Sequence, residues 1–449
     1  MCDFKNVLEA FETNKAFYEE KVNSGIENYR KGDAKIKVVD KNGKVIPNVK
    51  IKFNHKKHEF KFGTNIFNIN GFETEEKNEL YKKYISELCS ILTLPFYWDA
   101  TEPEEGKTRY DKDSCYIYRR PPIDLCMEFC EQYGIEPREH ALAYDQFFPK
   151  WLYDASDEKV KAALEKRYAE ISERYAHRIN TIEVTNEMEH DVGKTGFYDA
   201  PEFVEWCFKL AEKYFPNNQL CINEHTILPW GDRGRVTDKY YAYIEANMLK
   251  GARIDAIGMQ YHLFLKRENL YAGSRMTLDP VQLYRHMDLY ARFGKPFHLT
   301  EVTVPAYSLE AEDEEMQAEI IEKLLSVWFS YPNVEQVIYW NLVDGYTYQG
   351  NPDPEKGKAS QGDMTQGDNY YYGGLLRYDM SPKPAYYKIK ELLQERWHTE
   401  GETVTDNNGC AEFRGFFGEY EMSITVDGNT TEQKFTLSSK ANNEYTLVI

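Results

Sequence analysis

The chain has 449 residues, of which 15% are aromatic and eight are cysteines, and its formal net charge is −19 at pH 7. This length exceeds one ordinary domain, and the acidic charge argues against a nucleic-acid partner, which needs a basic face that releases counterions. The cysteines form no CxxC pair and no apolar run reaches the length of a membrane span, so we predict neither a disulfide framework, nor a metal site, nor a transmembrane helix.

Residues 1–33 form the first segment, and their composition is helical. Phe4, Val7, Leu8 and Phe11 recur at mixed helical spacing, which predicts one or two helices lying on a surface. The segment is charged throughout and has no apolar stretch of the kind that signal peptides carry. The expected location is therefore cytoplasmic, or secreted if a leader has been trimmed from the sequence.

Residues 34–58 and 399–449 have the alternating patterns of β-strands. Residues 34–40 and 49–53 alternate on either side of Asn42-Gly43, a hairpin signal, so a two-stranded ribbon is expected there. An isolated ribbon is marginally stable in water and needs further strands. We therefore predict one β-sandwich module built from both ends of the chain, with two unrelated β appendages as the alternative. The C-terminal strands are expected at residues 411–416, 420–426, 431–437 and 445–449.

Residues 59–398 contain eight apolar, strand-like runs separated by stretches long enough for amphipathic helices. One unit of roughly 30 to 45 residues, repeated eight times, is what a (β/α)8 TIM barrel of the α/β class requires. A Gly-rich loop at 350–374 follows the eighth run and is expected to cover the active-site face. The eight runs are residues 60–66, 91–96, 135–142, 181–186, 219–223, 255–262, 296–302 and 336–342.

Polar side chains collect at the ends of these runs, and the carboxyl ends of barrel strands meet on one face. Glycoside hydrolysis requires two carboxyl groups that flank the bond, and the fourth and seventh strands face each other across a barrel. We therefore predict Glu187 as the acid/base and Glu301 as the nucleophile, with Asn186 donating to a sugar hydroxyl and His262 holding the nucleophile. The strand ends carry His140, Asn186, Glu187, Asn223, Glu224, Gln260, His262, Glu301, Trp340, Asn341 and Asp344.

Several of these runs resemble segments of glycoside hydrolase family 10, the xylanase family. TIEVTNE at 181–187 resembles its acid/base segment, IDAIGMQYHL at 254–263 its sixth strand, and HLTEV at 298–302 its nucleophile segment. The resemblance runs in order from about residue 60 to about residue 393, and it implies a retaining β-glycosidase on a barrel. The substrate-binding residues that it implies are Trp98, His140, Tyr144, Asn186, Asn223, Gln260, His262, Trp340 and Tyr348.

The chain departs from the family pattern on the glycone side of the site. Leu94 and Tyr97 replace an amide and an ammonium group, so we expect apolar surface where the family has hydrogen-bond donors. Poor cleavage of long unsubstituted xylan and better activity on short or substituted oligosaccharides are the predicted consequence. Other departures are Tyr144-Asp145 for a Trp-His pair, Thr303 for an Asp that supports the sixth-strand histidine, and Tyr348 for a covering Trp.

The leading prediction is a xylanase-like retaining glycoside hydrolase that cleaves β-linked xylan-derived or related oligosaccharides by double displacement with two Glu. One alternative is a retaining barrel β-glycosidase with exo or decorated-substrate specificity. Another is a non-catalytic carbohydrate-binding protein on the same fold. No metal or organic cofactor is implied, because two carboxyls suffice for the reaction. The expected partner is an oligosaccharide or polysaccharide, not nucleic acid or a membrane.

Overall fold

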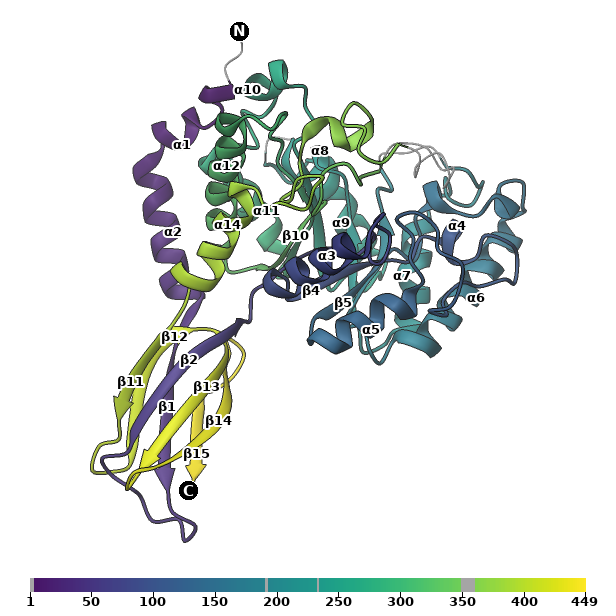
Figure 1. The fold of residues 1–449 in the computed structure, drawn as a ribbon. Helices are drawn as coiled ribbons and strands as arrows, with labels where there is room; N and C mark the ends of the chain where they lie inside the picture. Colours follow the sequence, from purple (N-terminus) through teal and green to yellow (C-terminus); the bar gives the residue numbers. More distant parts are fainter. Residues whose placement is uncertain (1–3, 190–192, 232–233, 349–359) are drawn as a thin grey trace.

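A computed structural model describes residues 4–189, 193–231, 234–348 and 360–449 of the chain. The molecule has two parts, a barrel wrapped in helices and an elongated β-sandwich that projects from one of its ends (Figure 1). Of the loop predicted at 350–374, residues 350–359 lie outside the described ranges.

Eight parallel strands close into a barrel in the order β10-β3-β4-β5-β6-β7-β8-β9, as predicted from the eight apolar runs. Helices cover the outer face of these strands, so most strand residues are buried on both faces of the sheet. β6 is buried at every residue. The strands are β3 (Lys61–Asn65), β4 (Ile91–Pro95), β5 (Glu136–His140), β6 (Thr181–Asn186), β7 (Gln219–Asn223), β8 (Ala256–His262), β9 (Phe297–Thr303) and β10 (Val334–Tyr339).

Local capping residues set several of the helix boundaries. The hydroxyls of Thr74 and Ser156 accept from backbone N–H groups three residues on, and Gly134 ends its helix in the left-handed conformation. The main helices of the barrel are α3 (Glu75–Leu88), α5 (Ile123–Tyr133), α6 (Asp157–Tyr175), α7 (Phe203–Tyr214), α9 (Lys239–Leu249), α11 (Pro280–Tyr290), α12 (Ala311–Ser330) and α14 (Pro384–Glu391). Short turns are α4 (Trp98–Thr101), α8 (Ile227–Trp230), α10 (Leu270–Gly273), η2 (Asp145–Phe147), η3 (Lys150–Leu152), η4 (Arg267–Asn269), η5 (Ala291–Phe293), η6 (Gly367–Tyr371) and η7 (Leu392–Arg396).

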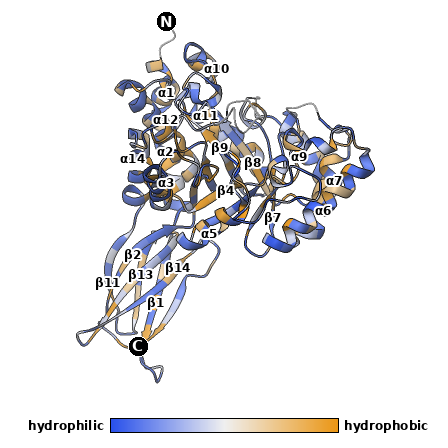
Figure 2. Cartoon of the chain, turned by 45° about the vertical axis from the view of Figure 1, so that its right-hand side comes forward, coloured by the Kyte–Doolittle hydropathy of each residue, from blue (hydrophilic) through white to orange (hydrophobic). Residues whose placement is uncertain are grey.

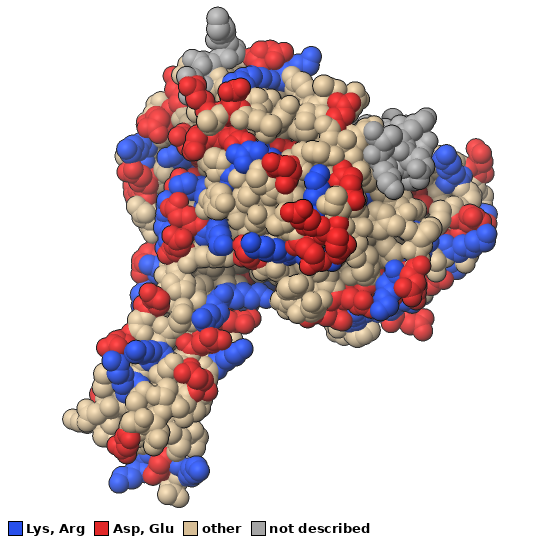
Figure 3. All heavy atoms as spheres, in the orientation of Figure 1, with Lys and Arg blue, Asp and Glu red and all other residues tan. Residues whose placement is uncertain are grey.

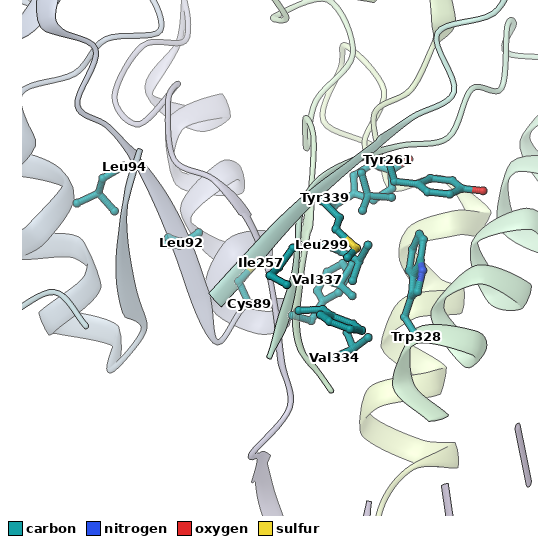
Figure 4. Close-up of a cluster of buried hydrophobic side chains, with 14 of the residues drawn as sticks. Cys89, Leu92, Leu94, Ile257, Tyr261, Leu299, Trp328, Val334, Val337 and Tyr339 are labelled. Carbon is teal, nitrogen blue, oxygen red and sulfur yellow. The ribbon is translucent and has the colours of Figure 1, made fainter. Parts of the chain in front are cut away.

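The core of the barrel lies between its strands and the surrounding helices. Leu299 and Val337 face Trp328 of α12, and the Tyr261 ring meets the Trp328 indole edge-on at 5.0 Å (Figure 4). Hydrophobic residues accordingly concentrate on the strands and on the inner faces of the helices (Figure 2). Acidic and basic side chains are interspersed on the face of the molecule drawn in Figure 3.

The β-sandwich contains strands from both ends of the chain, as predicted. One sheet has the order β12-β1-β15 and the other β11-β2-β13-β14. β1 and β2 do not pair with each other, so the predicted ribbon is wrong. Their apolar faces instead meet across the core, which buries both, whereas a hairpin would leave one face exposed. The strands are β1 (Lys31–Val39), β2 (Lys50–His58), β11 (Glu400–Val404), β12 (Cys410–Phe416), β13 (Gly418–Val426), β14 (Asn429–Leu437) and β15 (Glu444–Val448).

The sandwich adjoins the amino-terminal end of the barrel. β2 runs into β3 with two residues between them, and a junction cavity of about 710 Å³ is lined by Lys61, Asn180 and Glu335 of the barrel and by Ser438 of the sandwich. The chain begins with η1 (Phe4–Asn6), α1 (Glu9–Thr13) and α2 (Lys15–Tyr29), and α2 packs on α12. The carboxyl ends of the barrel strands therefore face away from the sandwich.

The described residues give no sign of a membrane helix or of a metal cluster. None of their helices is both long and apolar enough to cross a bilayer, and no three His, Cys, Asp or Glu side chains among them gather in a way that would hold a metal ion. Seven cysteines, from Cys89 to Cys410, are free thiols within the described ranges.

Candidate active site

Two glutamates approach each other at the carboxyl-terminal mouth of the barrel. Glu187 follows the last residue of β6, and Glu301 lies in β9. The amide nitrogen of Gln260, in β8, donates to Oε1 of Glu187 at 2.8 Å and to Oε1 of Glu301 at 3.0 Å. Because one nitrogen reaches both oxygens, these oxygens are separated by at most two hydrogen-bond lengths, about 6 Å. Glu187 has a φ of 53°, a conformation that non-glycine residues adopt mainly at functional sites.

Glu301 is the more enclosed of the two carboxyls, with 6% of its surface exposed. Asn223 donates to Oε1 at 3.3 Å, beside the donor from Gln260, and Nε2 of His262 lies 3.4 Å from Oε2. Burial raises the pKa of Glu301 to about 8, and the negative charge of Glu187 adds to that rise. The two amide donors act in the opposite direction, because they stabilise the ionised form.

The hydrogen-bond chain of Thr303 determines which nitrogen of His262 carries its proton. The Thr303 hydroxyl donates to the carbonyl of Trp340 and lies 2.9 Å from Nδ1 of His262. That hydroxyl therefore accepts from Nδ1–H, and Nε2 presents its lone pair to Glu301. Burial lowers the pKa of His262 to about 4, so the ring is neutral near pH 7.

Glu187 and Asn186 are held from several sides. The Tyr144 hydroxyl donates to Oε2 of Glu187. The side-chain oxygen of Asn186 accepts from Asn223 at 2.7 Å and from Gln260 at 3.3 Å. This leaves the Asn186 amide nitrogen with no acceptor among the described residues. Asn223 and Gln260, predicted to bind substrate, are fully buried and instead position the carboxyls and Asn186.

A buried ion pair below the site orients His140. Arg138 donates to Oε2 of Glu183, and Nδ1 of His140 donates to Oε1 of Glu183 at 2.7 Å. Burial alone would raise the pKa of Glu183, but the charge of Arg138 and the hydrogen bonds from Arg138 and His140 lower it to about 2. Nε2 of His140 then accepts from the Tyr97 hydroxyl at 2.9 Å. Sequence reasoning missed Arg138 and Glu183. Their only signal in the sequence is a charged side chain inside a predicted barrel strand.

Of the four predicted aromatic residues, Trp340 and Tyr348 join Tyr144 near the catalytic cluster and Trp98 does not. The Trp340 ring meets His140 edge-on at 5.6 Å, and Tyr348, 38% exposed, meets Phe147 at 6.3 Å on the rim. Trp98 is 2% exposed, and its Nε1 donates to Glu102 at 2.9 Å. The structure therefore places Trp98 in the packing beneath the site and not with the other predicted residues.

The wall formed by β4 differs from the prediction. Leu94 is fully buried in the main core and offers no surface, so its predicted contact with substrate is wrong. Tyr97 lies on the wall, but the guanidinium of Arg120 covers its ring at 3.6 Å from the centroid. The guanidinium of Arg120 thus supplies a cation at the position where Tyr97 was predicted to replace an ammonium group. It comes from residues 110–122, a connection whose path no local pattern indicates.

Comparisons with known proteins agree with this geometry. The sequence model of glycosyl hydrolase family 10 matches residues 52–392. Endo-1,4-beta-xylanase 2 of Arabidopsis thaliana is 24% identical over 344 residues, covering 76% of the chain and 27% of that protein. Anti-sigma-I factor RsgI6 of Acetivibrio thermocellus is 24% identical over 417 residues, covering 91% of the chain and 47% of that protein. The chain thus spans less than half the length of either relative.

Solved structures share the barrel fold. Xylanase 10B from Thermotoga petrophila, in complex with xylobiose, superposes with a TM-score of 0.59 at 21% identity over 75% of this chain and 95% of that chain. Native xylanase 10B from Thermotoga maritima gives a TM-score of 0.58 at 22% identity over 75% and 96%.

Proposed function

The chain belongs to glycosyl hydrolase family 10, and we propose that it is a retaining, xylanase-like glycoside hydrolase with Glu187 as acid/base and Glu301 as nucleophile. The observation that carries the proposal is the bridge from Gln260 to both carboxyls. It keeps the two Oε1 atoms within about 6 Å of each other, which favours the close spacing of 5 to 5.5 Å of retaining enzymes over the 6.5 to 9.5 Å of inverting ones.

In the first step Glu301 attacks the anomeric carbon while Glu187 gives its proton to the departing glycosidic oxygen. The product is a glycosyl ester of Glu301 and a free aglycone alcohol. In the second step Glu187 takes a proton from water, and the water oxygen displaces Glu301 from the anomeric carbon. Two inversions give net retention, and both glutamates return to their starting state.

The neighbours of the pair fit these roles. Asn223 and Gln260 donate to Glu301, so they stabilise its ionised form before attack and its return as a leaving group. The reaction needs Glu301 ionised and the transferable proton on Glu187. The amide nitrogen of Asn186 is available to donate to the 2-hydroxyl of the sugar, a contact that strengthens in the transition state.

The proposed substrates are xylan-derived or related β-linked oligosaccharides. Support comes from family membership and from relatives named as xylanases. The remaining candidate is a sugar-binding protein without turnover on the same fold. The enclosed, hydrogen-bonded pair supports catalysis, because binding alone does not require two carboxyls held at this separation.

The test is the stereochemistry of hydrolysis. Purified protein is incubated with xylotriose and with an aryl β-xyloside, and the anomer that forms first is followed by proton NMR. Initial release of the β-anomer, lost in Glu301→Gln, is the expected result. Initial α-anomer would contradict retention. Tight binding of xylotriose without hydrolysis of either substrate would support the sugar-binding candidate.

A further inference from the structure

We propose that Arg120 binds a carboxylate on the substrate, so that the preferred oligosaccharide carries a uronic acid unit on its glycone side. This inference rests on the proposed function and deepens it. Four features of the structure carry it: the place of the guanidinium, its lack of an acidic partner, the anchoring of its segment, and the chemistry of the surrounding wall.

The guanidinium of Arg120 lies on the same wall as the catalytic cluster. Its central carbon is 3.6 Å from the centroid of Tyr97 and 5.2 Å from that of Phe147. The hydroxyl of Tyr97 donates to His140, whose ring in turn meets Trp340. A ligand group that reaches Arg120 therefore lies beside the ring that bonds His140, at the mouth of the barrel.

Arg120 has no carboxylate partner within the ranges that the structure describes. Its recorded hydrogen bond is from Nη1 to the carbonyl of Arg119 at 2.9 Å. Asp99 is close enough to act on it electrostatically but forms no ion pair with it, and burial raises the pKa of Asp99 to about 6. Burial lowers the pKa of Arg120 by more than the charge of Asp99 raises it, so Asp99 does not offset the desolvation of the guanidinium.

Other arginines of the chain show the contrast. Arg138 pairs with Glu183 in the barrel, and Arg377 pairs with Glu314 at 2.5 Å. A guanidinium removed from water at a cost of several kcal/mol normally has such a partner. Arg120 is partly buried and meets aromatic rings instead of a carboxylate, so the structure leaves an anion-binding position open.

Arg119 fixes the segment that carries Arg120. Its Nη1 donates to the carbonyl of Tyr346 at 2.7 Å, and its Nη2 donates to the side chain of Asn341 at 3.0 Å. Asn341 also accepts from Asn65 at the end of β3, at 2.8 Å. These bonds tie residue 119 to the loop after β10. The position of Arg120 is therefore built into the fold, as a preorganised binding group requires.

The chemistry of the wall favours a sugar acid. A guanidinium binds a carboxylate through two parallel hydrogen bonds, and the partly exposed ring of Phe147, 5.2 Å from the guanidinium carbon, offers an apolar surface to a pyranose. Neutral hydroxyls would also accept from Arg120, but they would not offset the charge. A uronic acid attached to a β-linked backbone supplies both a carboxylate and a ring face.

The test compares three oligosaccharides of equal backbone length: neutral, carrying one glucuronic acid branch, and carrying the same branch with its carboxyl reduced to an alcohol. We expect wild-type kcat/KM to be highest on the acidic substrate and to fall about tenfold or more on carboxyl reduction. Arg120→Gln should lower the ratio of acidic to reduced rates to near one. Arg120→Lys should retain an intermediate ratio, because charge remains but the bidentate geometry is lost.

Arg275→Gln is the matched control. Arg275 also lies over a tyrosine, 5.1 Å from the ring of Tyr271, but it is exposed and its Nη2 donates to the hydroxyl of that same tyrosine at 3.4 Å. Its substitution should leave the ratio unchanged. An equal fall on all three substrates in Arg120→Gln would make Arg120 a general sugar contact and overturn the proposal. An unchanged ratio would overturn it as well.

Failure of the proposed function gives a different result. If the wild-type protein hydrolyses none of the substrates, the affinities of the acidic and reduced oligosaccharides are measured by calorimetry, with and without Arg120→Gln. A carboxylate preference that depends on Arg120 would uphold this inference while refuting the catalytic assignment. Equal affinities of both ligands would overturn the inference independently of catalysis.

Discussion

Replacement of Glu301 by glutamine is expected to abolish turnover and to stabilise the fold at alkaline pH. Glutamine has no nucleophilic carboxylate, so the glycosyl ester cannot form. Burial raises the pKa of Glu301 from 4.5 to about 8. The folded state therefore binds this proton more tightly than the unfolded state. The resulting stability is fully present below pH 4.5 and is lost as the pH rises through 8.

Glutamine fits the site without the free-energy cost that the ionised carboxylate of Glu301 bears there. Its oxygen can accept from Asn223 and Gln260 as Oε1 of Glu301 does. Its nitrogen can donate to Nε2 of His262, which lies 3.4 Å from Oε2 of Glu301 and presents a lone pair because Thr303 accepts from Nδ1–H. The ionised carboxylate of Glu301, by contrast, points an oxygen lone pair at the lone pair of His262 Nε2, which is unfavourable.

The pKa rise of Glu301 sets the size of the effect. Each unit of pKa difference between folded and unfolded states corresponds to about 1.4 kcal/mol, so the full cost of ionisation approaches 5 kcal/mol. Relaxation and water penetration around the ionised group reduce this cost, and we expect about 2–5 kcal/mol at pH 9. For a barrel of this size, with an unfolding entropy of about 0.7 kcal/mol per kelvin, that corresponds to a Tm increase of roughly 3–7 °C.

The assay is thermal unfolding of wild type and Glu301→Gln at pH 5, 7 and 9. The difference in Tm should be small at pH 5 and should grow with pH. Glu173→Gln, on the exposed face of α6, is the control and should change Tm little at any pH. Equal Tm values for Glu301→Gln and wild type at pH 9, or a lower value for the variant, would refute the assignment of a desolvation cost to Glu301.

Three further predictions concern the pair and the network beneath it. Glu187→Ala should lose hydrolysis of substrates with poor leaving groups while retaining aryl glycosides with good ones, and azide should speed breakdown of the intermediate; equal loss on both would contradict the acid/base role. Attack needs ionised Glu301, whose pKa is raised, so kcat/KM on an activated xyloside should rise with pH, with the apparent pKa of that rise above pH 6. An apparent pKa near 4.5 would contradict this prediction. Arg138→Met should cost about 3–5 kcal/mol in chemical denaturation by stranding Glu183, against under about 1 kcal/mol for Arg174→Met at a part-exposed pair.

The barrel was predictable because its signals are local. Most strands lie in runs rich in apolar residues that can be recognised without information about other segments. All eight predicted runs lie within a few residues of the observed strands. Glu187 and Glu301 could be selected for the same reason. A polar residue at the end of such a run lies at the mouth of a barrel wherever the connecting loops go.

The sequence by itself therefore determined the eight strands, the shared β-sandwich and the convergence of the two glutamates. Only the tertiary structure decided that β1 and β2 face each other across the sandwich, that Leu94 and Trp98 are buried, and that Arg120 covers Tyr97. Alternation specifies an apolar face but not which other face covers it. The place of Arg120 depends on bonds from Arg119 to residues more than 200 positions away, and no periodicity along the chain records contacts of that kind.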